Sequence, residues 1–406
     1  MTSLTPLLLA ALLSQPSRTE ALAQTDAYGG SLAIGAEATG WFRVEELTNA
    51  AGQRRWMFVT PEGHGYVALG ANHVGRYLDE QAAEYGLLAR LGTSRDGAAD
   101  WLIGQMRDLG LNAGEAYAPI MPEITERLPW VANVRFPGPS KFAFDPFDSA
   151  FRRRLDESIR MQCAAFADNR LVLGIAFPDL PVWDERRLAY FDGLPADAPG
   201  AIERQRFRDA GRTDDAFLAH VADTLYRQIR ESTRTAAPNH LLFGERFRLR
   251  GTPDEVIAAV GPHIDVFCTQ ALILSPQRPP EWQLFQPPRY IEEHRLAGKP
   301  MVVIDWAAPF SLGETLETQR GAIRNERAAA DEAAEWLVAA VSQPYVVGVF
   351  KCQLIGTHAN DRWFDGRARR TYLQDDGQPF AYRTERTRQA HREALEIAYG
   401  LTTPAK

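Results

Sequence analysis

The sequence predicts an α/β fold, a (β/α)8 TIM barrel with an N-terminal β-hairpin extension. Eight short apolar segments recur along the chain and alternate with longer segments of helical periodicity. Strands that alternate with helices form parallel units, and eight of them favour closure into a barrel over an open sheet. The 406 residues suffice for one barrel with extensions, and a hydrophobic content of 45% suffices for a large core.

Two segments are expected to precede the barrel. Residues 4–13 are apolar but too short to span a bilayer, and Ala21, Leu22 and Ala23 form a small-x-small pattern. This predicts a signal peptide over 1–23 and a secreted or periplasmic protein, or a cytoplasmic one if the leader is not a signal. Residues 24–65 are the extension, with a loose lead-in over 25–37, a β-hairpin over 40–60 and a turn over 61–65.

The barrel itself is expected over residues 66–400. Its strands are predicted at 66–70, 113–116, 131–136, 171–177, 241–247, 266–270, 301–304 and 346–350. Helices are predicted at 99–109, 151–167, 213–236, 253–260, 290–297 and 320–342. Residues 184–212 form a long insertion after the fourth strand, and residues 275–288 form a proline-rich loop after the sixth.

Composition and missing motifs exclude several functions. The net charge of −7 argues against a nucleic-acid partner, and no other segment is apolar enough to span a membrane. The GxGxxG, P-loop, GxSxG and HExxH motifs are absent, so no cofactor and no metal are expected. Cys163, Cys268 and Cys352 lie far apart without CxxC spacing, which predicts buried structural thiols.

The candidate catalytic residues are carboxylates that follow barrel strands, because active sites of this fold lie at the carboxyl ends of the strands. Asp179, Glu245 and Asp305 occupy such positions. Two carboxyl groups can cleave a glycosidic bond, one as general acid and the other as nucleophile or base. Asp179 could instead be a turn residue. Glu245 could form a structural ion pair with Arg246, and Asp305 could form one with a neighbouring strand-end arginine.

Polar and aromatic residues at the same strand ends are the candidate substrate-binding groups. Trp183 and Trp306 could stack on sugar rings, whereas Trp336 lies in the apolar stripe of a helix and is expected in the core. Lys351 could bind an acidic substituent or form an ion pair with Asp305. The remaining candidates, which can bond sugar hydroxyls, are Asn72, His73, Arg76, Arg246 and Gln270.

Several short stretches resemble β-agarase-like proteins of the retaining (β/α)8 glycoside hydrolase clan. They read GWFRVE at 40–45, WMFVTPEGH at 56–64, GANHV at 70–74, DLPVW at 179–183, LFGERF at 242–247 and GKP at 298–300. The resemblance covers most of residues 40–400. It implies a glycoside hydrolase acting on a polysaccharide or oligosaccharide, such as a β-galactan.

The chain departs from the clan at both catalytic positions. The clan carries an Asn-Glu pair after the fourth strand, where this chain has Pro178 and Asp179, and a Glu after the seventh, where it has Asp305. The roles carry over as carboxylate for carboxylate, with Asp179 as general acid, Asp305 as nucleophile or base and Glu245 as the alternative partner. Retention and inversion both remain open, because shorter side chains change the carboxyl separation. A non-catalytic glycan-binding barrel and a sugar lyase using Glu245 with Lys351 are the alternatives.

Overall fold

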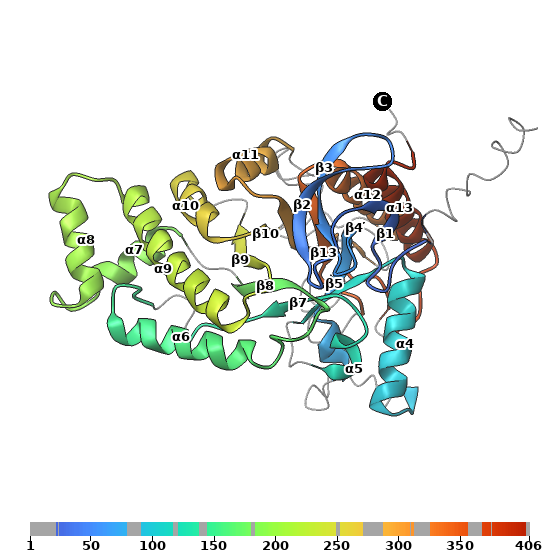
Figure 1. Cartoon of the computed structure of the whole chain (residues 1–406), viewed down its shortest axis with the longest axis horizontal. Coiled ribbons are helices and arrows are strands. Elements are labelled where there is room, and N and C mark those ends of the chain that lie inside the picture. The colour runs from blue at the N-terminus through green and yellow to red at the C-terminus, as the bar shows by residue number, and fades with distance from the viewer. Residues whose placement is uncertain are drawn as a thin grey trace, which may run out of the picture.

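The expected barrel is present in the computed structural model (Figure 1). Its described residues are 22, 24–78, 91–116, 121–137, 144–179, 183–248, 252–270, 287–308, 310–311, 325–355, 368–374 and 376–402. Eight strands close in the order β10-β11-β13-β5-β6-β7-β8-β9, and each neighbouring pair is parallel. The strands are β5 (Ala68–Asn72), β6 (Ala113–Ala116), β7 (Trp130–Asn133), β8 (Val172–Asp179), β9 (Leu242–Arg248), β10 (Phe267–Gln270), β11 (Met301–Trp306) and β13 (Val346–Lys351).

Helices surround the barrel. They are η1 (Val74–Leu78), α4 (Arg95–Asp108), α5 (Pro122–Thr125), α6 (Ser149–Cys163), α7 (Glu185–Asp192), α8 (Pro199–Asp209), α9 (Asp214–Ala236), α10 (Asp254–Val260), η2 (Gly261–His263), α11 (Pro287–Ala297), α12 (Glu326–Ser342) and α13 (Arg383–Tyr399). In α9, Phe217, Val221 and Leu225 recur at helical spacing and are buried, and Thr213 caps its first turn. No helix among the described residues is long and apolar enough to cross a membrane.

The predicted hairpin is part of a larger antiparallel sheet. Strands β2 (Arg43–Thr48) and β3 (Arg54–Val59) pair as expected. The lead-in expected over 25–37 contributes β1 (Ser31–Gly35), and β4 (His64–Tyr66) completes the order β1-β4-β3-β2. Tyr66 was expected to start the first barrel strand, which instead runs from Ala68 to Asn72. A two-stranded sheet of β12 (Phe310–Ser311) and β14 (Ala368–Arg369) lies apart from these strands in the sheet order.

This N-terminal sheet covers the end of the barrel at which the strands begin. Phe42, Phe58 and Tyr66 share one buried cluster with side chains of the barrel interior. The ring of Phe58 stacks on that of Phe243 in β9, with centroids 5.8 Å apart. The extension is therefore continuous with the barrel core, and the opposite end of the barrel is the one available for a site.

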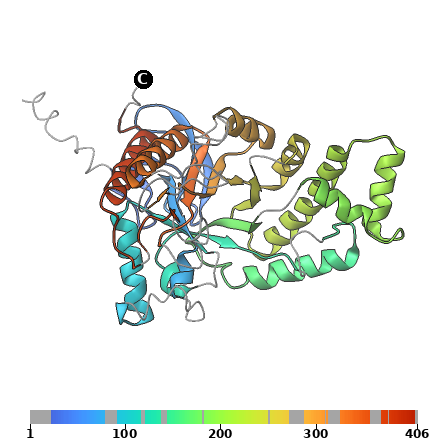
Figure 2. The same ribbon diagram turned by 180° about the vertical axis from the view of Figure 1, so that it is seen from behind.

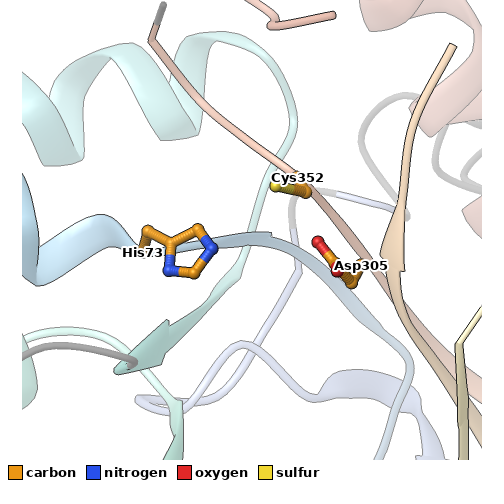
Figure 3. Close-up of side chains that lie close together, drawn as sticks. All are labelled: His73, Asp305 and Cys352. Atoms are coloured by element: carbon orange, nitrogen blue, oxygen red, sulfur yellow. The ribbon is translucent and has the colours of Figure 1, made fainter. Parts of the chain in front are cut away.

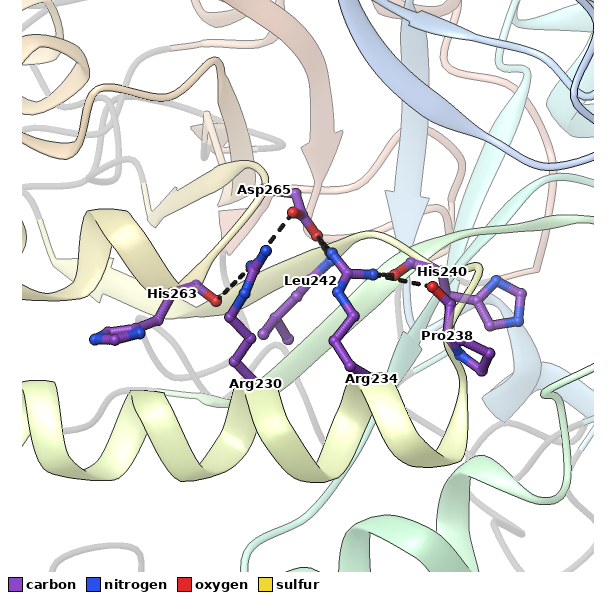
Figure 4. Close-up of polar contacts among 7 residues, drawn as sticks. All are labelled: Arg230, Arg234, Pro238, His240, Leu242, His263 and Asp265. Atoms are coloured by element: carbon purple, nitrogen blue, oxygen red, sulfur yellow. Dashed lines mark hydrogen bonds and ion pairs between the residues drawn. The ribbon is translucent and has the colours of Figure 1, made fainter.

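The insertion expected over 184–212 folds into α7 and α8. Figures 1 and 2 show both helices beyond α6 and α9 on one side of the barrel, while α12 and α13 cover the opposite side. Figure 4 shows a polar network that joins α9 to the loops leading into β9 and β10. Asp265 accepts hydrogen bonds from Arg234 at 2.6 Å and from the backbone N–H of Leu242 at 2.7 Å. These bonds fix the starts of two barrel strands and hence the positions of their carboxyl ends.

Candidate active site

Asp305, in the seventh barrel strand, lies at the centre of a polar cluster. Its Oδ2 atom accepts a hydrogen bond from Gln270 Nε2 at 2.5 Å and lies 3.4 Å from Arg246 Nη1. Asn72 Nδ2 donates to its Oδ1 atom at 3.4 Å. These partners come from β10, β9 and β5, so the barrel itself brings four sequence-predicted residues together. The Asp305 side chain is still 17% exposed, which leaves it accessible.

His73 and Cys352 complete this cluster. Figure 3 shows the side chains of His73, Asp305 and Cys352 converging from separate strand ends, with donor atoms all within 4.8 Å of one another. The Cys352 sulfur lies within 4.8 Å of the nearest ligand atoms of Asp305 and His73. Burial, followed by the charge of Asp305, raises the pKa of Cys352 well above its usual value. The thiol therefore stays protonated at neutral pH.

The backbone at this cluster is strained. Among the described residues, His73 with φ 62° and Asp305 with φ 64° are the non-glycine residues with positive φ. The left-handed region costs a residue with a Cβ about 1–2 kcal/mol. Such strain persists where the surrounding structure enforces it, and it concentrates at functional sites. Both strained residues belong to one cluster, which marks it as the candidate active site.

Glu245, the third candidate carboxylate, faces away from Asp305. Its backbone follows Gly244, whose φ of 73° and register irregularity break the strand alternation. Trp183 Nε1 donates to Glu245 Oε1 at 2.5 Å, and the backbone N–H of Glu245 donates to the Tyr226 hydroxyl of α9 at 3.0 Å. Burial raises the pKa of Glu245 to about 8. The expected ion pair with Arg246 is replaced by these contacts, since Arg246 reaches Asp305.

The two candidate stacking tryptophans lie in the layer between barrel and helices. Trp183 is 1% exposed and bonds Glu245. Trp306 is 2% exposed and packs on Trp336 of α12, with ring centroids 4.5 Å apart. The burial of Trp336 agrees with its expected place in the core. Neither Trp183 nor Trp306 offers a face to solvent, which a stacked sugar ring would require.

Lys351 lies in the same layer. Its ammonium group sits over the rings of Trp306 and Tyr372, at 4.9 and 4.3 Å from their centroids. Burial lowers the pKa of Lys351 well below its usual value. No ion pair joins Lys351 to Asp305 among the described side chains. Lys351 is therefore separated from the cluster that includes its neighbour Cys352.

Two candidates have side chains outside the described set. Asp179 is the last residue of β8, and its backbone pairs in register with that of Arg246 in β9. Arg76 belongs to η1, which follows Asn72 and His73. The side chains of both residues lie outside the described part of the chain. Their backbones nevertheless lie at the strand ends that carry the cluster.

Cys352 is the site residue that spacing rules did not identify. It directly follows the last barrel strand, and that position was the available signal. Motif rules compare residues close in sequence, whereas His73, Asp305 and Cys352 come from strand ends more than two hundred residues apart at the extremes. Barrel closure alone brings them together.

No family model and no curated protein sequence matches this chain. Solved structures do match it. An agarase has a TM-score of 0.72 at 18% identity, over 95% of this chain and 71% of that one. An exo-β-agarase has a TM-score of 0.75 at 15% identity, over 96% and 72%. A β-D-glucuronidase from Dictyoglomus thermophilum has a TM-score of 0.53 at 12% identity, over 86% and 53%. The expected resemblance to agarase-like barrels is thus confirmed at the level of the fold.

Proposed function

We propose that this chain hydrolyses a glycosidic bond of a polysaccharide or oligosaccharide, with Asp305 as nucleophile or base. The observation that carries the proposal is the fixation of Asp305 by Asn72, Arg246 and Gln270. A charge held by donors from three strands is oriented before substrate arrives, so little reorganisation is needed in the transition state. The likeness of the fold to agarases supports a β-galactan as the first substrate to test.

Asp179 is the proposed general acid. Its backbone is adjacent to that of Arg246, whose side chain contacts Asp305. Inverting enzymes separate the two carboxyl groups by about 6.5–9.5 Å and retaining enzymes by about 5–5.5 Å. The stereochemistry of the first product, read by NMR, assigns this chain to one class. Asn72, His73, Arg76, Arg246 and Gln270 are the proposed partners of sugar hydroxyls or of a charged substituent.

A glycan-binding barrel without turnover is the second candidate. The orientation of Glu245 favours it, because Asp305 is the one candidate carboxylate whose described side chain reaches the cluster. The sugar lyase has weaker support, since Glu245 and Lys351 are both buried in the layer between barrel and helices. Export is proposed from the leader over 1–23, and N-terminal sequencing of the mature protein would test cleavage after Ala23.

The test compares wild type with Asp305→Asn and Asp179→Asn on a panel of polysaccharides that includes agarose. New reducing ends measure turnover, and affinity electrophoresis measures binding. Each substitution should lower turnover by about 10²–10⁴-fold, the range for loss of an acid or base. Asp156→Asn on the exposed face of α6 is the matched control. Full turnover in either site variant would overturn the assignment, and binding without turnover in wild type would establish the second candidate.

Removing the charge of Asp305 also leaves the buried Arg246 without this counter-ion, so a loss of stability could mimic a loss of catalysis. Thermal unfolding of each variant separates the two effects. Rescue provides a second control, because azide or formate can replace a missing carboxylate nucleophile in an Asp305→Ala variant. Rescued turnover would demonstrate that the rest of the site is intact.

A further inference from the structure

His73, Asp305 and Cys352 offer three different donor atoms to a common point (Figure 3). They are an imidazole nitrogen, a carboxylate oxygen and a sulfur, the donor set that zinc-class cations prefer. With bonds of about 2.0–2.3 Å, donors around a tetrahedral zinc ion stand roughly 3.3–3.8 Å apart. The donor atoms already lie within 4.8 Å of one another, so movements of about 1 Å or less complete the geometry.

Asn72 provides an independent observation at the same place. Its side chain is fully buried, and its amide nitrogen contacts Asp305. Its Oδ1 atom has no hydrogen-bond partner among the described residues. A buried carbonyl oxygen without a partner costs about 1–3 kcal/mol. A bound cation, or a water on that cation, would satisfy this oxygen.

The surroundings of Asp305 match those of a metal-binding carboxylate. Gln270 and Arg246 both engage Oδ2, and Oδ1 carries the longer contact to Asn72. Outer partners of this kind orient a ligating carboxylate. His73 and Asp305, the two residues with left-handed backbones, both lie beside Cys352 (Figure 3). The strain is thus located at the proposed ligands themselves.

We propose that His73, Asp305 and Cys352 bind a thiophilic divalent cation of the zinc class at the open end of the barrel. Binding exchanges the Cys352 S–H bond for a metal–sulfur bond, and the proton leaves to solvent. Three protein ligands leave one tetrahedral position for water or for Asn72. A cation that prefers oxygen ligands, such as Mg²⁺, is not expected to bind there.

This proposal has a regulatory consequence that rests on the proposed function. A cation on Asp305 occupies the carboxylate that would attack the sugar or activate water. Zinc should therefore inhibit hydrolysis, and a chelator should restore it. Cation binding itself does not depend on hydrolysis, so each can fail without the other.

The binding test titrates the full chain with Co²⁺ in the absence of glycan. A thiolate ligand gives a sulfur-to-cobalt charge-transfer band, and tetrahedral coordination gives intense visible bands. We expect one equivalent of Co²⁺ to produce both signals and Zn²⁺ to displace it. Cys352→Ala should abolish the charge-transfer band. His73→Ala should weaken binding by at least about 100-fold, since even outer partners are worth 10–100-fold. Cys163→Ala, a buried thiol of α6, is the matched control and should change neither.

A second group could bind cobalt without a thiol and must be distinguished. Asp26, Glu62 and His64 also bring donor atoms within 4.8 Å. Asp26 already accepts hydrogen bonds from Gly30 and Thr60 and contacts His64, so this group is internally satisfied. Binding there would lack a charge-transfer band and would survive Cys352→Ala. A saturated wild-type spectrum without the band, or a band that persists in a folded Cys352→Ala variant, would overturn the proposal.

Discussion

Replacement of Glu245 by glutamine tests the electrostatics of the barrel–helix layer. Glu245 is fully buried, its carboxyl group accepts a hydrogen bond from the indole of Trp183, and its backbone N–H donates to the hydroxyl of Tyr226. Burial raises its pKa to about 8, so the folded protein carries it protonated at neutral pH. Glutamine has the shape of a protonated glutamate and keeps an oxygen acceptor for Trp183. The variant should therefore resemble the wild type at low pH.

The stability difference should grow with pH. The folded pKa of about 8 lies above the unfolded value of 4.5, so the stabilisation is complete below pH 4.5 and is lost as pH rises through 8. Each pKa unit corresponds to about 1.4 kcal/mol, so the wild type loses about 5 kcal/mol over this window. Glu245→Gln removes this loss and should be more stable than wild type by a few kcal/mol at pH 8.

Urea unfolding at pH 5, 6, 7 and 8 measures the difference. Other buried groups also make stability depend on pH, such as His391, whose pKa burial lowers to about 4, but they contribute equally to wild type and variant. Glu157→Gln on the exposed face of α6 is the control and should track the wild type at every pH. A constant difference between wild type and Glu245→Gln from pH 5 to pH 8 would refute the assigned burial and protonation of Glu245.

Two further substitutions test the framework by urea unfolding. Asp265→Ala removes the acceptor of Arg234 and of a strand N–H and should cost about 2–3 kcal/mol, whereas Asp156→Ala in an exposed ion pair should cost less than about 0.5. Equal losses of stability in the two variants would contradict the role of Asp265 in holding the strand starts in place. Gly70→Ala places a Cβ 2.3 Å from the Phe350 ring inside the barrel and should cost about 1–3 kcal/mol. As the control, Gly104→Ala places its Cβ in open space within α4 and should stabilise the protein by about 0.5–1 kcal/mol. An unchanged stability of Gly70→Ala would show that the Phe350 ring moves to make room for the added Cβ.

The sequence predicted the barrel well because buried strands and helices have recognisable patterns of apolar residues. Strands β8 and β11 begin with uninterrupted apolar runs, over 172–177 and 301–304, and helix α9 carries a periodic apolar face. Strand ends were less predictable. The first barrel strand continues to Asn72, where a polar residue is buried because it contacts Asp305. The position of Asp305 at a strand end was readable, and its role as the centre of the cluster was not.

Side-chain direction was the main information that the sequence lacked. Glu245 and Arg246 are neighbours, yet the irregularity at Gly244 sends one towards the helices and the other towards Asp305. A glycine within a predicted strand does not by itself show which of the following side chains will point to the other face of the sheet. Trp183 and Trp306 follow strand ends as a stacking residue would, but tertiary packing buries both. The neighbours of Cys352 could be identified only from the closed barrel, because they lie far from it in the sequence.

The sheet that covers the base of the barrel is made early in synthesis but is completed by contacts with residues made late. The backbone N–H of Trp56 in β3 donates to Pro344, and that of Ala50 donates to Tyr399 at the end of the last helix. At a ribosomal rate of about 5–20 residues per second, the partner of Ala50 emerges roughly 20–70 s after Ala50 itself. During that time the N-terminal sheet lacks its contacts with the C-terminal end of α13. The contacts of this sheet with the end of α13 can therefore form only after residue 399 has been made.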